Sequence, residues 1–293
     1  MGDKQRKESS KKRSFGLLSI YLGFLGILLI ILGEITTFLR IEPFVYWFIA
    51  MVWFGYIFLV DSLVYMLEGN SYITNRPRKF IILVFLSAIF WLIFEFYNKF
   101  LGGWYYIGTP TEPGKCIPCY VAISTILPAV METTELIKGL RFFRKTRTTK
   151  IRISNSLIYS SILIGLIFVI TPFLYHSPYM WAFVWIGFIF LLDPINYLFH
   201  ERSLISQIKK GKLNIVLSLF VAGYICGFFW EFWNYWAYTK WYYTVPILSE
   251  IKIFEIPFLG FFAYGFFAWE LYTMYHFAKL LIPTDLETKL ELK

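Results

Sequence analysis

Charged residues are scarce in this chain of 293 residues: Asp, Glu, Lys and Arg make up 16% of it, and 58% is hydrophobic. A soluble domain carries about 25% charged residues, so this shortage excludes a water-soluble protein. Apolar runs long enough to cross a bilayer as an α-helix recur between short polar breaks. We therefore predict an all-α integral membrane protein with about eight transmembrane helices. The expected spans are 15–38, 43–67, 80–101, 119–140, 154–175, 178–199, 213–238 and 258–282.

Cysteine and histidine are also rare, with three of each. Cys116 and Cys119 form a C-x-x-C motif in a predicted outer loop, where they suit a disulfide or a redox pair. Two cysteines alone do not make a structural zinc site, and His176, His200 and His276 are not spaced as a metal cluster. The sequence also lacks an H-E-x-x-H motif, a glycine-rich phosphate loop and a G-x-S-x-G motif. We therefore expect no metal and no cofactor.

The formal net charge of +9 is explained by where the basic residues lie. Segments 1–14, 68–79, 141–152, 200–212 and 279–293 hold 22 of the 28 Lys and Arg residues. By the positive-inside rule these segments and both termini are cytoplasmic. The first span is expected to be retained, because it is too long for a signal peptide and lacks a cleavage site. The expected partners are membrane lipids and a lipid or isoprenoid small molecule rather than nucleic acid, in a bacterial or archaeal cytoplasmic membrane.

Two stretches of the chain resemble each other. Residues 90–106 read FWLIFEFYNKFLGGWYY, and residues 226–243 read CGFFWEFWNYWAYTKWYY. Each contains a Glu-x-x-Asn motif followed by a Trp-Tyr-Tyr triplet, with an aspartate before and a glutamate after in the same order. Because the order is kept at a nearly constant offset, we predict an internal duplication. The matched pairs are Asp61 with Asp193, Glu95 with Glu231, Asn98 with Asn234, and Glu132 (or else Glu135) with Glu270.

The duplication predicts how the chain is organised. Four spans in each half make both halves run in the same direction, as parallel repeats about an axis along the membrane normal. A shared central cavity is expected where the halves meet. The predicted divisions are a basic tail at 1–14, a first repeat at 15–140, a basic linker at 141–153, a second repeat at 154–282 and a tail at 283–293.

The duplicated acids lie within predicted spans, where an ionisable group costs roughly 2.5–3.5 kcal/mol on insertion scales. They are expected to face inward, to pair, or to stay protonated, and a neutral carboxylic acid can donate a proton. Aromatic faces attract cations most strongly where water is excluded. Buried acids with an aromatic lining therefore suit protonation of an alkene and steering of the carbocation that results. The candidate catalytic residues are Asp61, Glu95, Glu132, Asp193, Glu231 and Glu270.

Aromatic residues and amides surround these acids in the sequence. The two asparagines lie three residues after a glutamate, on the same helix face, and are expected to hold the acid in position. The tryptophans and tyrosines are expected to shield the cation. The candidate substrate-binding residues are Trp91, Asn98, Trp104, Tyr105, Trp230, Trp233, Asn234, Trp241 and Tyr242.

This pattern resembles the small integral-membrane isoprenoid cyclases. In the lycopene cyclase type, two related multi-span halves each carry a membrane Asp, an aromatic cluster with Trp, and a Glu. The residues that follow this order here are Asp61, Trp104 and Glu132, then Asp193, Trp241 and Glu270. Trp230-Glu231-Phe232 is similar to the Trp-Glu-aromatic motif of membrane terpene cyclases, whereas the Pro-x-Glu-Glu signature of lycopene cyclases is missing. The resemblance implies protonating acids that work without a metal.

The sequence thus predicts a cofactor-independent cyclase or isomerase of an isoprenoid lipid, in which Glu95 or Glu231 protonates the alkene. Two alternatives stay open. Carboxylates within repeated halves also occur in proton-coupled transporters. Acids and amides also bridge helices in membrane proteins that bind lipids without catalysis. An aromatic cavity open sideways to lipid favours the enzyme, and a polar path between the two aqueous faces favours transport.

Overall fold

The computed structural model describes residues 2–110, 116–246 and 250–282, most of which are helical. Within them, seven helical segments are long and apolar enough to cross a membrane, so the chain is a helical, multi-pass membrane protein. The last of the eight expected spans forms helix α11, Phe258–Leu281, but it is not among those seven. Its tyrosines, together with Glu270 and His276, make it less apolar than the other segments.

The chain folds into two compact units. Helix α4, Pro77–Leu101, gives its first part to unit 1 and the rest to unit 2. The units therefore do not coincide with the predicted repeats, and the duplication stays a prediction. Unit 1 comprises Met1–Ala88, Gly108–Leu140 and Ala237–Thr239, and unit 2 comprises Ile89–Ile107, Arg141–Trp236 and Lys240–Lys293.

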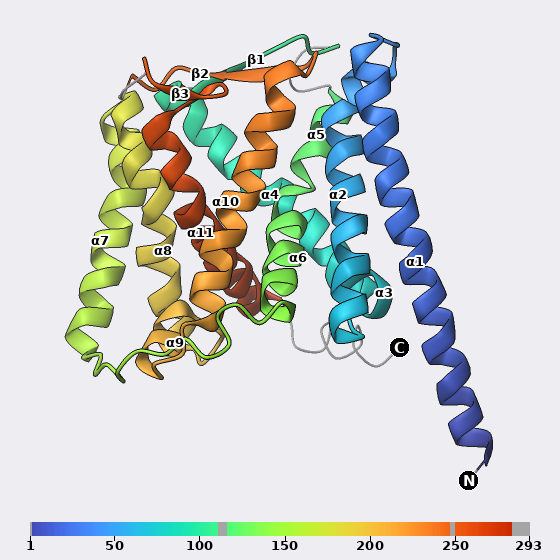
Figure 1. Ribbon diagram of the computed structural model, residues 1–293. Helices are drawn as coiled ribbons and strands as arrows, with labels where there is room; N and C mark the ends of the chain where they lie inside the picture. Colours follow the sequence, from blue (N-terminus) through green and yellow to red (C-terminus); the bar gives the residue numbers. More distant parts are fainter. Residues whose placement is uncertain (1, 111–115, 247–249, 283–293) are drawn as a thin grey trace. The chain divides into compact units, whose positions relative to one another are not determined.

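Unit 1 is built around the pairing of two long helices, α1 with α2 (Figure 1). Gly26 and Gly55 allow their close approach, because a Cβ atom at Gly26 would lie 2.5 Å from the carbonyl oxygen of Gly55. Its helices are α1 (Gly2–Phe38), α2 (Phe44–Glu68), α3 (Tyr72–Asn75), the first part of α4, α5 (Ile117–Ile123) and α6 (Ile126–Gly139).

The fourth expected span, 119–140, is two helices rather than one. The hydroxyls of Ser124 and Thr125 donate to the backbone oxygens of Val121 and Ala122, and α5 ends there. Local side-chain bonds of this kind compete with helix continuation. The C-x-x-C motif at the start of α5 is a disulfide between Cys116 and Cys119.

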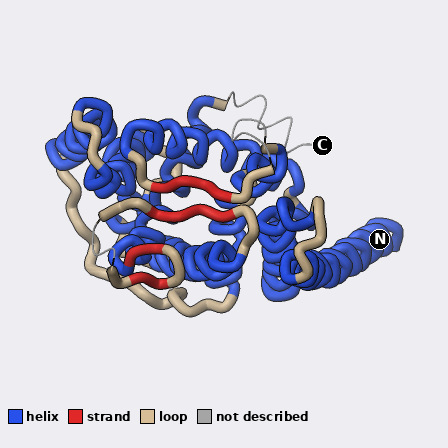
Figure 2. Tube along the Cα trace, turned by 90° about the horizontal axis from the view of Figure 1, so that it is seen from above, coloured by secondary structure: helices blue, strands red, loops and turns tan. Residues whose placement is uncertain are grey.

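Unit 2 holds helices that run side by side, α7, α8, α10 and α11, with short strands across one end (Figure 1). Figure 2, viewed from above, shows the two pairs of strands on that end. The elements are β1 (Trp104–Ile107), α7 (Asn155–Leu174), the 3-10 turn η2 (Pro178–Met180), α8 (Trp181–Leu198), α9 (Leu204–Lys209), α10 (Asn214–Trp236), β2 (Lys240–Tyr243), β3 (Lys252–Ile253), β4 (Ile256–Pro257) and α11.

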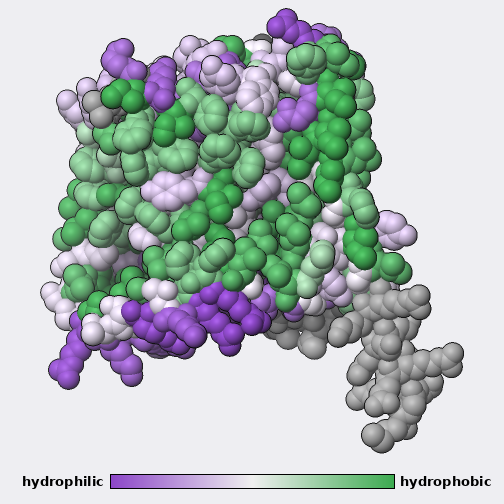
Figure 3. All heavy atoms as spheres, viewed as in Figure 1, coloured by the Kyte–Doolittle hydropathy of each residue, from purple (hydrophilic) through white to green (hydrophobic). Residues whose placement is uncertain are grey.

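The opposite end of unit 2 gathers basic residues. Arg147 of the linker pairs with Lys212 in an isolated antiparallel bridge, so two of the predicted cytoplasmic segments lie together. Hydrophobic residues cover the sides of the helices in unit 2, and hydrophilic residues collect at the end where α9 lies (Figure 3). This distribution fits helices whose sides face lipid and whose ends reach water.

Candidate functional site

The two Trp-Tyr-Tyr triplets form one antiparallel ribbon, β1 with β2. Trp104 lies opposite Tyr243, and Tyr106 lies opposite Trp241. Because side chains alternate along a strand, these four residues share one face of the ribbon. Aromatic residues also have a high β-propensity. The sequence predicted that these aromatic residues shield a cation, and it did not predict that they form a pair of strands.

The two asparagines fix the ribbon to the ends of α4 and α10. Asn98 Oδ1 accepts from the backbone N–H groups of Gly103 and Trp104 at 2.7 and 3.2 Å, and its Nδ2 donates to the backbone oxygen of Trp104 at 2.9 Å. Asn234 makes the same kind of pair with the backbone of Trp241, at 2.9 Å in each direction. The hydrogen bonds described for the two asparagines therefore hold the strands in position and do not involve the glutamates.

Each glutamate of the repeated motif accepts a hydrogen bond from a ribbon tyrosine. Tyr106 Oη donates to Glu95 Oε1 at 2.5 Å, and Tyr243 Oη donates to Glu231 Oε1 at 2.6 Å. The tryptophan two residues earlier in each strand donates its indole N–H to the same tyrosine, at 3.2 and 3.0 Å. The same contact thus occurs at the two positions that the sequence matched.

The remaining partners of the two glutamates differ. Glu95 Oε1 also accepts from the indole N–H groups of Trp91 and Trp104, both at 3.0 Å. Glu231 Oε1 instead accepts a second hydroxyl, that of Tyr264, at 2.5 Å. The other oxygen of Glu231 is buried and has no partner among the described residues. Indole N–H groups only donate, whereas a hydroxyl donates or accepts, so the two acids have different hydrogen-bonding environments.

Gly227 explains this difference. It lies four residues before Glu231, as Trp91 lies four residues before Glu95. A Cβ atom at Gly227 would lie 2.4 Å from the ring of Tyr264. The glycine therefore leaves the space in which the Tyr264 ring reaches Glu231. In the first stretch the corresponding position carries the indole that bonds Glu95.

The ribbon tyrosines are held in the neutral form. Burial, together with the charge of Glu95, raises the pKa of Tyr106 well above its usual value of 10.0. Burial and the neighbouring Glu231 raise the pKa of Tyr243 in the same way. A tyrosine is an acid, and loss of its proton in a buried site would leave an unsolvated charge. Both hydroxyls therefore keep a proton that they can share.

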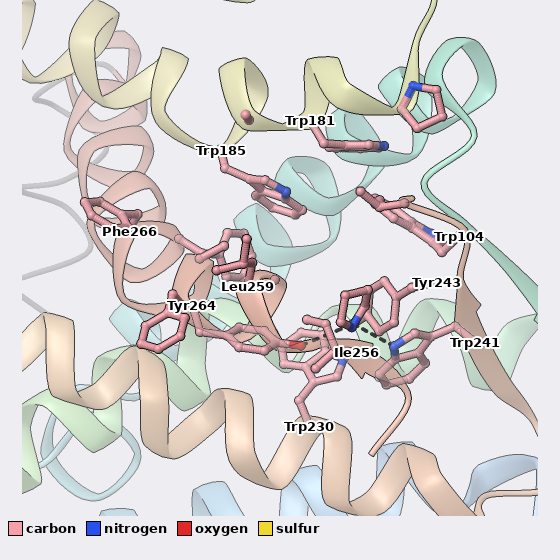
Figure 4. Close-up of a pocket in the computed structure, with 18 of the residues that line it drawn as sticks. Trp104, Trp181, Trp185, Trp230, Trp241, Tyr243, Ile256, Leu259, Tyr264 and Phe266 are labelled. Atoms are coloured by element: carbon pink, nitrogen blue, oxygen red, sulfur yellow. Dashed lines mark hydrogen bonds between the residues drawn. The ribbon is translucent and has the colours of Figure 1, made fainter. Parts of the chain in front are cut away.

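A cavity of about 360 Å³ lies between the ribbon and the helices of unit 2. Figure 4 shows Tyr243 and Tyr264 on one side of it, with Trp181 and Trp185 of α8 across from them. Rings dominate its wall: six tryptophans, three tyrosines and three phenylalanines. These aromatic lining residues are Trp91, Trp104, Tyr106, Trp181, Trp185, Trp230, Trp241, Tyr243, Phe262, Tyr264, Phe266 and Phe267.

The six tryptophans form a continuous series of ring contacts around the cavity. Trp104 is central, with its ring centroid 4.6 Å from that of Trp181 and 5.6 Å from that of Trp91. Trp91 in turn contacts Trp230 at 5.7 Å, and Trp181 contacts Trp185 at 5.2 Å. An aromatic ring carries negative charge density on its π faces. The cavity is therefore apolar yet attractive to positive charge.

The duplicated aspartates cap short helices. Asp61 accepts from the backbone N–H of Ile73 at 2.7 Å and from the hydroxyls of Ser71 and Thr74 at 2.9 Å, at the start of α3. Asp193 accepts from two backbone N–H groups at the start of α9, at 2.7 and 2.8 Å. A carboxylate at a helix N-terminus stabilises the helix. Both contacts therefore account for the aspartates as structural residues.

Glu132 and Glu270 are fully buried, and neither oxygen of either residue has a hydrogen-bond partner among the described residues. Glu132 belongs to α6 in unit 1, and Glu270 belongs to α11 in unit 2. Neither lines the cavity. Glu135, the alternative match to Glu270, instead pairs with Lys138 at 2.8 Å.

The structure places the predicted site residues in three groups. Trp91, Trp104, Trp230 and Trp241 line the cavity, and Glu95 and Glu231 lie directly behind the tyrosines that line it. Tyr105 and Tyr242 stack on each other with ring centroids 5.7 Å apart, and they do not line the cavity. Trp233 stacks on Phe229 and is likewise outside the lining.

The sequence analysis missed the residues that bring hydroxyls to the cavity. Tyr106 and Tyr243 are the third residues of the triplets. In a strand they share a face with the tryptophan two residues earlier, whereas the middle residue of the triplet faces the other way. Tyr264, Trp181 and Trp185 lie outside the two matched stretches, 90–106 and 226–243, so no sequence signal singled them out. Over the described ranges, no group of three or more His, Cys, Asp or Glu residues is placed to hold a metal ion.

Fold and site together define a class: a multi-pass helical membrane protein with an aromatic cavity backed by two partly buried tyrosine–glutamate pairs. Comparison of the chain with known protein families, with characterised proteins and with solved structures finds no match. The function is therefore argued from the site alone.

Proposed function

We propose that the protein is a membrane-embedded, cofactor-independent cyclase or isomerase of an isoprenoid lipid. The observation that supports this most is the pairing of an aromatic cavity with hydroxyls backed by carboxyl groups. Such a site supplies a proton to an alkene and then surrounds the cation with π faces. The resemblance to isoprenoid cyclases of the lycopene cyclase and membrane terpene cyclase types points the same way.

The first step moves one proton onto the substrate. The Tyr243 O–H bond breaks as the alkene π pair forms a new C–H bond, while the Tyr243 oxygen takes a proton from the carboxyl group of Glu231. A second π pair then attacks the cation in a cyclase, which closes a ring and moves the positive charge to another carbon. A neighbouring C–H pair finally forms the new double bond and releases its proton to the carboxylate of Glu95. Glu95 then loses this proton to water and Glu231 regains one from water, so the acid is restored. The atom count does not change, so the product is an isomer of the substrate.

The hydrogen bonds suggest different roles for the two acids. Glu231 is contacted by hydroxyls, which accept a proton as readily as they donate one, and this suits a proton donor. Glu95 is contacted by two indole N–H groups that only donate, and this suits a carboxylate that stabilises the cation and takes the last proton. Tyr106 would pass that proton between the cavity and Glu95.

The proposal includes the arrangement of the helices in the membrane. They form two parallel four-helix repeats, with α11 as the eighth span and both termini cytoplasmic. The basic segments that gather at the α9 end of unit 2 support this orientation. The ribbon then lies at the outer surface of a bacterial or archaeal cytoplasmic membrane, and the substrate is a lipid of that membrane.

The test is expression in cells that make candidate isoprenoids, with a search for products of unchanged mass and altered chromatographic retention. Tyr243→Phe and Glu231→Gln should lower the rate by about 10²–10⁴-fold, the usual contribution of a positioned acid. Tyr242→Phe is the matched control, because its hydroxyl is on the other face of the ribbon, and it should retain activity. Full activity in Glu231→Gln and in Glu95→Gln would exclude this mechanism.

A second candidate is a proton-coupled transporter, favoured by the fully buried and unpartnered carboxyl groups of Glu132 and Glu270. Acids of this kind mark proton pathways in transporters. The test is uptake into proteoliposomes driven by a pH gradient. Uptake that is lost in Glu270→Gln, with no isomeric product from any isoprenoid, would favour this function over the enzyme.

A further inference from the structure

The cavity wall offers a cation aromatic rings and aliphatic side chains, with rings in the majority. Tryptophan gives the strongest cation–π attraction, at distances up to about 6 Å from the ring centroid. Six of the chain's 11 tryptophans line this one cavity. Among the lining residues that the structure describes there is no Lys, Arg or His to repel a positive charge. Behind the wall, Glu95 and Glu231 are the nearest acidic groups to the ribbon tyrosines.

The polar groups of the wall limit which cation fits. The indole N–H groups of Trp91, Trp104 and Trp241 are donors already used by Glu95 and the ribbon tyrosines. The lining hydroxyls are those of Tyr106, Tyr243 and Tyr264, and each donates its proton to a glutamate. The oxygens of Tyr106 and Tyr243 also accept from an indole N–H group, so few acceptors in the wall are left for an ammonium group. A primary ammonium carries three N–H groups that need acceptors. A quaternary ammonium needs none, because its charge is spread over methyl groups.

The rim of the cavity indicates what the cation is attached to. Leu259, Phe262 and Phe266 line the cavity and are also 45%, 46% and 39% exposed. Their spacing of three and four residues puts them on one face of α11. On the ribbon side the lining residues are buried or half-buried. The cavity therefore opens along the apolar side of α11, where a hydrocarbon chain can lie.

The size of the cavity agrees with a small head group. A cavity of about 150 Å³ accommodates a benzene molecule. The volume of about 360 Å³ therefore holds a trimethylammonium group and a few methylene groups, but not a long lipid. The remainder of a longer molecule would extend out past Leu259 and Phe262.

From this geometry we infer a ligand class that goes beyond the proposed reaction: amphiphiles that carry a quaternary ammonium group on an alkyl chain. The head group occupies the tryptophan-lined cavity and the chain leaves along the exposed face of α11. If the protein is the proposed enzyme, such a ligand resembles the cation formed during turnover and inhibits competitively. Binding itself requires no turnover.

The experiment uses the full chain purified in dodecyl maltoside micelles, a neutral detergent without a choline group. Hexyltrimethylammonium is titrated while tryptophan fluorescence is recorded, with empty micelles as the blank. Its carbon isostere 2,2-dimethyloctane and the primary amine hexylammonium are titrated in parallel. We expect hexyltrimethylammonium to bind at least about tenfold more tightly than either, because only it has a permanent charge without N–H groups.

A pair of variants on α10 locates the binding. Trp230 lines the cavity, whereas Trp236 is 42% exposed and does not. Trp230→Leu should weaken hexyltrimethylammonium binding about tenfold, and Trp236→Leu should leave it unchanged. Equal binding of the charged and the neutral compound, or equal losses in the two variants, would overturn the inference. If Trp230→Leu does not fold, the comparison of the three compounds on the wild-type chain decides.

The result of this binding experiment can be distinguished from the result of the test for isomeric products. If the protein binds hexyltrimethylammonium selectively but makes no isomeric product, the ligand class is supported and the proposed enzymatic function is excluded. Isomerisation without selective binding overturns the ligand class alone. Inhibition that rises with hexyltrimethylammonium and is relieved by more substrate supports both.

Discussion

Gly227 is the position at which a single methyl group should disconnect Tyr264 from Glu231. An alanine Cβ there would lie 2.4 Å from the Tyr264 ring, whereas ordinary contact begins at 3.4 Å. The ring must move by about 1 Å, and the 2.5 Å hydrogen bond from Tyr264 to Glu231 cannot survive such a shift. Overpacking of this size costs about 1–3 kcal/mol, and the lost hydrogen bond adds about 0.5–1.5 kcal/mol.

The assay is thermal unfolding in detergent, followed by tryptophan fluorescence. A loss of about 2–4 kcal/mol corresponds to a fall in Tm on the order of 5–10 °C for a chain of this size. Tyr264→Phe keeps the ring and removes only the hydroxyl, so its Tm should fall less. Gly16→Ala is the matched control, because a Cβ atom at Gly16 meets nothing within 4 Å. A Gly227→Ala protein that unfolds within about 1 °C of the wild type would refute the packing argument.

Three further predictions follow from the contacts of the ribbon and the caps. Asn234→Ala should leave the backbone groups of Trp241 without their partners and speed amide hydrogen exchange at Trp241 by about tenfold, or about 1.4 kcal/mol; unchanged exchange would show that the asparagine does not hold the strand. Asp193→Ala should leave the backbone N–H groups of Leu204 and Ile205 without their acceptor, although Ser203 still caps α9, and should lower stability by about 0.5–2 kcal/mol, measured as Tm. A loss of turnover at unchanged Tm would point to catalysis instead. Since the folded protein raises the pKa of Tyr106 and Tyr243, it binds their protons more tightly than the unfolded chain does. This contribution to the free energy of unfolding is complete below a pH of about 10 and is lost as the pH rises further. The measurement is a pH titration of tyrosinate absorbance, and absorbance that develops fully at the usual pKa would contradict this prediction.

The helices were the most predictable part of the protein. Apolar runs of about 20 residues predict membrane helices because few other structures satisfy the backbone in lipid. The break between α5 and α6 was not predicted, since it depends on the local bonds of Ser124 and Thr125. Helix α11 is not among the seven most apolar segments, because its tyrosines, Glu270 and His276 lower its hydropathy, so the eighth span stays a prediction.

The site was predictable only where the motif repeats. Glu95 and Glu231 were found because acids in matched positions of apolar segments are conspicuous. Tyr105 and Tyr242 lie outside the cavity lining because side chains alternate along the two strands, which the sequence did not predict. Tyr264 could not be found, because its contact with Glu231 depends on the packing of α11 against α10.

The difference between Gly227 and Trp91 has a stereochemical consequence. Glu95 is contacted by two indole N–H groups and Glu231 by a second tyrosine hydroxyl, so the two acids cannot exchange roles. If the proposed reaction takes place, an alkene held in the cavity meets its proton donor from one side only. The reaction should then create a new stereocentre of one handedness, with the side set by Trp91 at one acid and Gly227 at the other.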